Sequence, residues 1–492
     1  MIYFILLPIL FPILMGVYLL VRKEMKNRKN LLITVGVSLI ITVILGLSAI
    51  FLIKGRGLLL FHLTQQLPVL FQIDEMGTIF AIAAMIVFIC AGFFSFEYMT
   101  HEEKEKRYYG FYLIVFGILI ALCFAGNIIT FYLFFEMLTL FSMPLVLHNG
   151  SKEAIMAGLK YLFYSLCGAY MALFGLYFLS KFANTLSFSE GGVLNLELAA
   201  GQSGILLITA FVMILGFSVK AGMFPMHAWL PTAHPVAPAP ASAVLSAMIV
   251  KMGVLGIIRV VYYLYGISFL QGTWVQTVWM VLSLITVFMG SMLAYREPVF
   301  KKRLAYSTVS QVSYILYGLS VMDIESVTGG LMHVIGHAFI KSALFLCIGA
   351  IIYKTGKTRV EELRGIGKEM PLLMWCYTIV SLGLIGIPPT GGFISKWYLA
   401  LGSLKSGISD FSWIGPVILL ISALLTAGYL LPITIRGFFP GADYNYEKLE
   451  KKEPSLMMTI PILILALLSV LMGLFPNVLA DFITNFLSSM FV

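Results

Sequence analysis

The sequence predicts an all-α protein that crosses a membrane about fourteen times. Of its 492 residues, 60% are apolar and only 11% are charged, whereas a soluble chain carries about 25% charged residues. Apolar runs of about 20 residues, long enough to cross a bilayer as a helix, recur along the whole chain. The loops between them are short, so we expect a single transmembrane domain over 1–492.

Fourteen apolar segments account for these crossings. In order they are 1–21, 31–53, 75–98, 109–126, 128–148, 154–181, 205–230, 240–264, 274–295, 303–322, 328–353, 371–403, 412–436 and 455–476. The seventh and twelfth contain prolines, which remove a backbone donor and clash with the preceding turn, so we expect both to be discontinuous. The segment 477–492 is too short to span, and we expect it along the membrane surface.

Basic residues alternate along the chain with the predicted spans. The loops after spans 1, 3, 9, 11 and 13 each hold three to five lysines and arginines, while the even-numbered loops hold little beyond Lys54, Arg56 and Lys405. Basic loops stay on the cytoplasmic side of a membrane. We therefore expect the inner or plasma membrane of a prokaryotic cell, crossed many times, with both termini on the outer face.

Several site classes have no support in the sequence. The five cysteines stand singly inside apolar runs, without the paired spacing of a zinc or iron–sulfur site. No glycine-rich phosphate motif stands between a strand and a helix. The net charge of +9 follows from the membrane loops and needs no nucleic acid to explain it. We expect no metal and no cofactor in this chain, and a first helix that is retained rather than cleaved.

Ionisable residues at bilayer depth are the strongest functional signal, because a charge there is costly. Those inside the spans are Glu136, Lys220, Lys251, His333, His337, Lys341 and Lys396. His333, His337 and Lys341 follow one another at steps of four and therefore share one helix face. His227 and His234 lie at the break in the seventh span, after Pro225, and are candidates for proton uptake or gating.

A lysine and a carboxylate at depth can form a proton switch. Burial favours the neutral form of a lysine, and a nearby carboxylate favours its charged form. Glu136 is the only acid at mid-depth in the first half of the chain, so we expect it to pair with Lys220. The breaks at Pro225 and at Pro388 and Pro389 free backbone carbonyls, which are tolerated at depth only beside protein or water. We expect hydrated cavities and gating at these breaks.

Structural roles remain open for part of this set. Lys341 and Lys396 have the alternative of extending to the membrane surface, and each histidine has that of an ordinary hydrogen-bonded core residue. Five polar residues of the tenth span suit either ordered water or helix–helix hydrogen bonds. They are Ser307, Thr308, Ser310, Gln311 and Ser313.

Four stretches resemble one family of membrane proteins. They are GMFPMHAWLPTAHPVAPAPASAVLSAMIVKMGVLGIIR, KKRLAYSTVSQVSYILYGL, HVIGHAFIKSALFLCIGA and GIPPTGGFISKWYLALG. Together they are similar to the antiporter-like subunits of complex I, of Mrp sodium/proton antiporters and of energy-converting membrane-bound hydrogenases. The resemblance runs from about Tyr108 to Arg436.

The resemblance implies a fold and a set of roles. Three helices (1–107) precede two inverted five-helix repeats (108–264 and 274–436), and a last helix with a short tail follows (455–492). Glu136 and Lys220 resemble the family's glutamate–lysine pair, Lys251 its connecting lysine, and Lys396 the ionisable residue near the exit. His333 and His337 resemble the histidines that link the two halves, with Lys341 one step further.

The resulting expectation is a proton-translocating subunit, with sodium coupling left open, of a redox-driven complex such as a membrane-bound hydrogenase or a complex I relative. Its partners are other membrane subunits, the lipid bilayer and the transported ions. The chain itself is expected to carry no redox site. Three alternatives stay open: an Mrp-type antiporter subunit, a structural membrane anchor, and haem-based electron transfer through His333 and His337.

Overall fold

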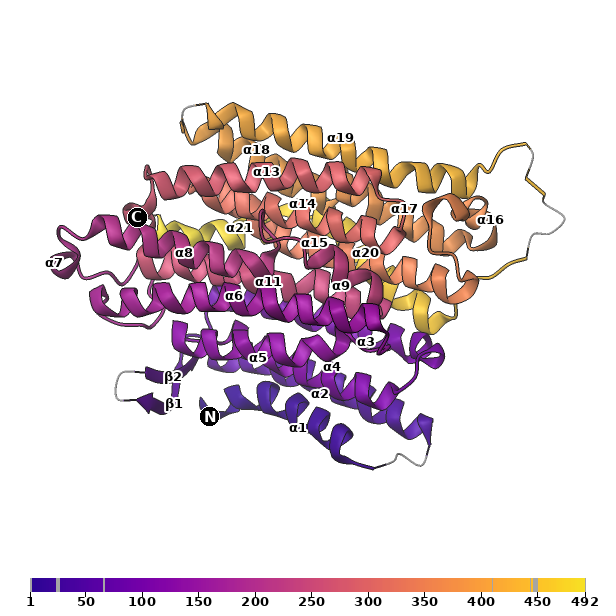
Figure 1. Cartoon of the computed structure of the whole chain (residues 1–492), viewed down its shortest axis with the longest axis horizontal. Helices are drawn as coiled ribbons and strands as arrows, with labels where there is room; N and C mark the ends of the chain where they lie inside the picture. The colour runs from indigo at the N-terminus through magenta and orange to yellow at the C-terminus, as the bar shows by residue number, and fades with distance from the viewer. Residues whose placement is uncertain are drawn as a thin grey trace.

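Long apolar helices running side by side make up most of the structure (Figure 1). The structure is a computed structural model that describes residues 2–23, 27–64, 67–408, 410–442, 444–445 and 450–491. The helices are η1 (Ile2–Leu6), α1 (Leu7–Val21), α2 (Arg28–Ile53), α3 (Glu75–Tyr98), η2 (Met99–His101), α4 (Glu105–Cys123), α5 (Ile128–Val146), α6 (Lys152–Phe182), α7 (Leu196–Ala199), α8 (Ser203–Ala221), α9 (Leu230–Val236), α10 (Ala239–Val244), η3 (Leu245–Ile249), α11 (Val250–Ile258), η4 (Arg259–Tyr265), α12 (Ile267–Leu270), α13 (Trp274–Arg296), α14 (Phe300–Val321), α15 (Ile324–Thr355), η5 (Val360–Leu363), α16 (Ile366–Glu369), α17 (Pro371–Ile385), α18 (Gly391–Lys405), α19 (Phe411–Phe438), α20 (Leu456–Leu474), α21 (Pro476–Leu487) and η7 (Ser488–Met490). The two strands are β1 (Gly57–Thr64) and β2 (Leu67–Gln72).

The predicted count of membrane passes is confirmed. Within the described residues, 12 helices are long and apolar enough to cross a membrane. The tenth predicted pass is the 22-residue helix α14, which is more polar. The twelfth is made of two shorter helices, α17 and α18, joined end to end through a short break. Together these give the fourteen passes that the sequence predicts.

Both broken passes end their first helix at a glycine in the left-handed region. Gly222 (φ 78°) follows α8, and Gly386 (φ 94°) follows α17. Glycine adopts this conformation without steric cost, which allows the chain to leave the helix at once. The seventh pass was expected to continue to residue 230; its helix ends earlier, at Ala221, and α9 begins only after a turn. As the seventh and twelfth passes, the two run in opposite directions.

The eighth pass lies at the centre of the bundle. It runs without interruption from Ala239 to Tyr265, and its most apolar window is wholly buried inside the protein. Two stretches, η3 and η4, widen into π-helical turns. Such turns are rare and frequently occur at functional sites.

Two features at one end of the bundle were not predicted. The segment 54–74 was expected as a loop, but it contains the antiparallel hairpin β1–β2, in which Gly57 pairs with Gln72. The C-terminal segment forms α21, which packs against α15 and buries Ile483 and Leu487. Both features lie near the chain termini (Figure 1).

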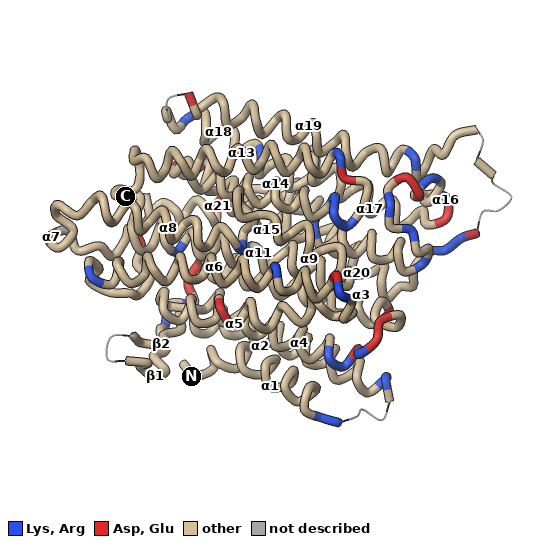
Figure 2. Tube along the Cα trace, viewed as in Figure 1, with Lys and Arg blue, Asp and Glu red and all other residues tan. Residues whose placement is uncertain are grey.

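Charged residues are concentrated at the opposite end of the bundle. Figure 2 shows most lysines and arginines in the loops beside α16, α17 and the start of α2, while both termini lie toward the other end. The three-dimensional arrangement therefore keeps the two-sided charge distribution that the loop pattern predicts.

Candidate functional site

Lys220 stands at the C-terminal end of α8, immediately before the first break. Its side chain is buried, and Nζ donates to Thr139 Oγ1 of α5 at 2.6 Å. The ammonium also lies over the ring of Phe135, 4.6 Å from its centroid. Trp229 Nε1 donates to the carbonyl of Val219 at 2.8 Å and fixes the turn behind it. The C-terminal end of a helix and an aromatic face both stabilise a cation.

Glu136 lies on α5, one turn before Thr139, but does not touch the lysine. It is half-buried, and its carboxyl group lies beside the hydroxyl of Tyr132. No ion pair joins Glu136 to Lys220 in the described part of the chain, although their charges interact through space. The direct pair expected from the sequence is therefore replaced by the contact between Lys220 and Thr139.

Lys251 and His337 form the centre of the site. Lys251 lies on α11 of the buried eighth pass and His337 on α15, and both side chains are wholly inaccessible to solvent. Lys251 Nζ lies 3.0 Å from His337 Nδ1 and also donates to the carbonyl of Ala247. The π-helical turn η3 lies directly before Lys251. The structure thus joins the two halves of the chain through one hydrogen bond between two ionisable groups.

His333 and Lys396 continue the series to the second break. His333 Nδ1 lies 2.9 Å from Ser395 Oγ on α18, next to Lys396 in the chain. Lys396 Nζ donates to the carbonyls of Leu384 and Ile385 at 2.6 and 2.9 Å. These are the last residues of α17, so the ammonium caps the negative end of that helix.

Lys341 lies one turn beyond His337 on α15, on the side of the basic end of the bundle. It is wholly buried and donates to the carbonyl of Leu304 at 2.8 Å and to Ser307 Oγ, both on α14. It also lies over the ring of Phe345, at 5.9 Å. Its ammonium is fixed inside the protein, so in this single chain it does not reach the membrane surface.

The two remaining histidines differ in their surroundings. His234 is wholly buried and stacks on Phe345 at 4.9 Å, and neither ring nitrogen has a partner among the described residues. His227 is half-buried in the turn after α8, beside Phe224. Pro225, in the same turn, is exposed, as are the prolines of the second break, Pro388 and Pro389. Both breaks therefore have a proline at the surface of this chain.

One buried ion pair was missed from the sequence. Arg259 in η4 is wholly buried, donates from Nη1 and Nη2 to Asp74, and lies between the rings of Phe188 and Tyr263 at 4.5 and 4.6 Å. The signal was available, because Arg259 interrupts an apolar run and Asp74 directly precedes a predicted span.

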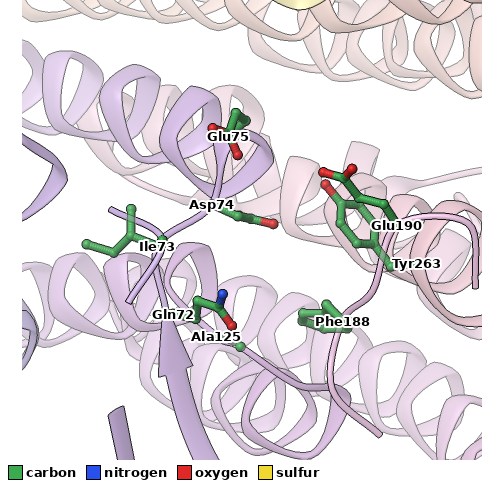
Figure 3. A pocket seen from close by; sticks show the side chains of 10 residues that line it. Gln72, Ile73, Asp74, Glu75, Ala125, Phe188, Glu190 and Tyr263 are labelled. Carbon is green, nitrogen blue, oxygen red and sulfur yellow. The ribbon is translucent and has the colours of Figure 1, made fainter. Parts of the chain in front are cut away.

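Asp74, the acidic member of this pair, lines a cavity of about 160 Å³ beside the hairpin. Asp74 extends into the cavity from one side, with Glu190 and Tyr263 on the opposite side (Figure 3). Asp74 also accepts from the backbone of Gly77 at 2.8 Å and so caps α3. The pair connects the start of the third pass to the end of the eighth.

Removing the hydroxyl of Thr139 is expected to destabilise the protein. In Thr139→Val the ammonium of Lys220 loses a buried acceptor, at a cost of about 1–3 kcal/mol. The thermal midpoint of the purified protein should fall, whereas Thr139→Ser, which keeps the hydroxyl, should stay near the wild-type value. An unchanged midpoint in the valine variant would show that Lys220 does not depend on this bond.

The sequence that builds this arrangement matches a known family. The family model described as "NADH:quinone oxidoreductase/Mrp antiporter, TM" matches residues 125–434. The chain belongs to this family. It is an antiporter-like membrane subunit, as the four motif stretches indicated, and the matched region contains every lysine and histidine of the site.

Two curated relatives carry names that refer to different membrane complexes. NADH-quinone oxidoreductase subunit N of Desulforudis audaxviator is 31% identical over 384 residues, covering 76% of this chain and 75% of the relative. An Na(+)/H(+) antiporter subunit of Alkalihalophilus pseudofirmus is 26% identical over 474 residues, covering 95% of this chain and 93% of the relative.

A solved structure shares the fold. A chain of the membrane-bound sulfane sulfur reductase, an archaeal respiratory membrane complex, superposes with a TM-score of 0.84 at 22% identity. The match covers 99% of this chain and 97% of the other. At this identity the comparison supports the fold of the whole chain.

Proposed function

We propose that this chain translocates protons as one membrane subunit of a redox-driven ion-pumping complex, either a complex I relative or a membrane-bound hydrogenase. The observation that carries the proposal is the hydrogen bond between Lys251 and His337 at the buried centre of the bundle. Burying two groups that exchange protons is costly, and helix packing alone does not require them. Such a pair suits proton transfer between the two halves of the protein.

The proposed proton path takes the buried ionisable groups one after another, with a direct hydrogen bond only between Lys251 and His337. Glu136 and Lys220 supply the first half, Lys251 and His337 the centre, and His333 the link toward Lys396. Glu136 would act on Lys220 through its charge rather than by contact, favouring the protonated lysine when it is near. Weakening that field would favour the neutral form of Lys220.

The central transfer needs only the two side chains. A protonated Lys251 has three donors and no acceptor, so His337 Nδ1 accepts from it. Transfer of that proton leaves a neutral lysine and an imidazolium. The imidazolium can then release a proton from its other nitrogen, Nε2, on the far side of the ring. One proton thus passes through the ring without any movement of the backbone.

Protons entering from the basic end would reach His337 through a second group of residues, His234 and Lys341. His234 and Lys341 both lie against Phe345, and Lys341 is one turn from His337 on α15. His227 and Pro225 occupy the turn that opens onto the surface. In this proposal the basic end faces the cytoplasm, both termini lie on the outer face, and 108–264 and 274–436 form inverted repeats.

Partner subunits would supply the driving reaction and carry the redox centres. The relative from Desulforudis is named for an NADH-quinone oxidoreductase, which supports a redox-driven assembly. This chain would be the non-redox membrane subunit.

The test is proton movement by the complex purified through an affinity tag on this chain. The complex is reconstituted in liposomes that contain a pH-sensitive dye, and NADH, reduced ferredoxin or H₂ is supplied in turn. Proton movement that needs an electron donor, with or without Na⁺, supports the proposal. No proton movement with any donor or with any sodium gradient contradicts it.

Sodium/proton antiport is the second candidate. It is favoured by the match to the Na(+)/H(+) antiporter subunit of Alkalihalophilus, which covers 95% of this chain. The same residues would carry protons, and a sodium gradient would drive them. In the same liposomes, proton movement driven by Na⁺ without an electron donor would select this alternative.

A further inference from the structure

The two linking histidines are not in hydrogen-bond contact with each other. The rings of His333 and His337 stack at a centroid distance of 5.7 Å with an interplanar angle of 27°. In each ring Nδ1 is engaged, by Ser395 and by Lys251 respectively. Each Nε2 is buried without a partner among the described residues. A proton that reaches His337 therefore needs a bridge to His333.

We propose that Gln311 holds bound water that carries the proton from Nε2 of His337 to Nε2 of His333. The inference rests on the proposed function and specifies how the path crosses between the two rings. Gln311 is wholly buried on α14, and both its Oε1 and its Nε2 lack a hydrogen-bond partner in the described part of the chain.

Three polar neighbours of Gln311 on α14 have hydrogen-bond partners on other helices. Ser307 bonds Lys341, Thr308 bonds Ser246 at 2.7 Å, and Ser310 bonds Ser291 at 2.8 Å. All three bonds join α14 to other helices, as the helix–helix alternative expects. Gln311 has no such contact, so its buried amide requires water. Ser313 also lacks a partner but is turned away from the Gln311 face of the helix.

The register of α14 against α15 places Gln311 beside the histidines. The two helices are antiparallel neighbours: Lys341 reaches Leu304 near one end, and Gly330 lies against Ile315 nearer the other. Between these two points, Gln311 falls at the level of residues 334–337 of α15. Tyr314, one turn further along α14, stacks on His333 at 5.7 Å, which agrees with this register.

The hydrogen bonds also set the direction of transfer. Ser395 Oγ donates to the carbonyl of Gly392 at 3.1 Å, so it accepts from His333 Nδ1 and leaves His333 Nε2 as an acceptor. Lys251 donates to His337 Nδ1, which leaves the proton on His337 Nε2. A water molecule between them receives a proton from His337 and gives one to His333. The amide of Gln311 holds the water and neither gains nor loses a proton.

The experiment compares Gln311→Leu with Gln311→Asn in the reconstituted complex. Leucine has nearly the same volume but cannot bind water, so donor- or sodium-driven proton movement should slow at least about tenfold. Asparagine keeps the amide and should retain most of the rate. Ser310→Ala, which alters only the packing side of α14, is the matched control and should retain the rate.

Thermal stability and water density distinguish this role of Gln311 from a purely structural one. The leucine variant should keep or raise the thermal midpoint, because it removes unpartnered polar atoms from the interior. High-resolution electron microscopy of the wild-type complex should show ordered water at both Nε2 atoms, and Gln311→Leu should lose it. A wild-type rate in Gln311→Leu, a midpoint lowered equally in both variants, or no such water would overturn the inference. If Lys251→Met leaves proton movement intact, the proposed function fails, and the water density alone decides the role of Gln311.

Discussion

Proton movement through the complex is expected to fall by at least about a hundredfold when Lys251 is replaced by methionine. Methionine fills nearly the same volume, so the buried eighth pass should still pack. It cannot carry a proton, and His337 Nδ1 loses its donor. Among the described residues no other ionisable side chain hydrogen-bonds His337, so the two halves of the path lose their link. The measurement is the initial rate of the lumenal pH change in liposomes, with assembly checked by size-exclusion chromatography.

The control is a lysine outside the path. Lys405 is half exposed at the end of α18 and pairs with Glu325. Lys405→Met removes the same charge at a surface ion pair of small value, and its rate should match the wild type. A Lys251→Met complex that assembles and still moves protons at the wild-type rate would exclude a relay through Lys251.

The architecture was predictable because it follows from composition and spacing. Runs of apolar residues and alternating basic loops fix the number of passes, and the prolines locate both breaks. The exact end of α8 was not predictable from proline, because Gly222 ends the helix before Pro225 is reached. The hairpin β1–β2 was missed because its residues do not alternate between apolar and polar, which is the pattern that indicates a strand.

The buried ionisable residues of the candidate site were predictable, but their contacts were not. An ionisable side chain inside a membrane span costs free energy, and this distinguishes Lys251, His337 and Lys396 in the sequence. Opposite charge predicted a pair between Lys220 and Glu136, whereas the helices place Thr139 beside the lysine instead. Neutral partners such as Thr139 and Ser395 carry no sequence signal, because hydroxyl residues are common in membrane helices.

Replacing Asp74 by asparagine is expected to destabilise the protein by about 3 kcal/mol. Asparagine still caps α3, so the change isolates the charge of the buried pair. Arg259, wholly buried between Phe188 and Tyr263, would then keep its charge without a counter-ion. The free energy of unfolding in a detergent titration, together with the thermal midpoint, measures the loss.

The double variant Asp74→Asn/Arg259→Met decides whether the cost comes from the orphaned charge. Replacing both members of a buried pair is often close to neutral, because the desolvation cost disappears with the attraction. The double variant should therefore recover most of the stability that Asp74→Asn loses. If it is as unstable as the single variant, the pair acts through shape and hydrogen bonding rather than charge. If Asp74→Asn alone is as stable as the wild type, the connection between the third and eighth passes does not depend on this pair.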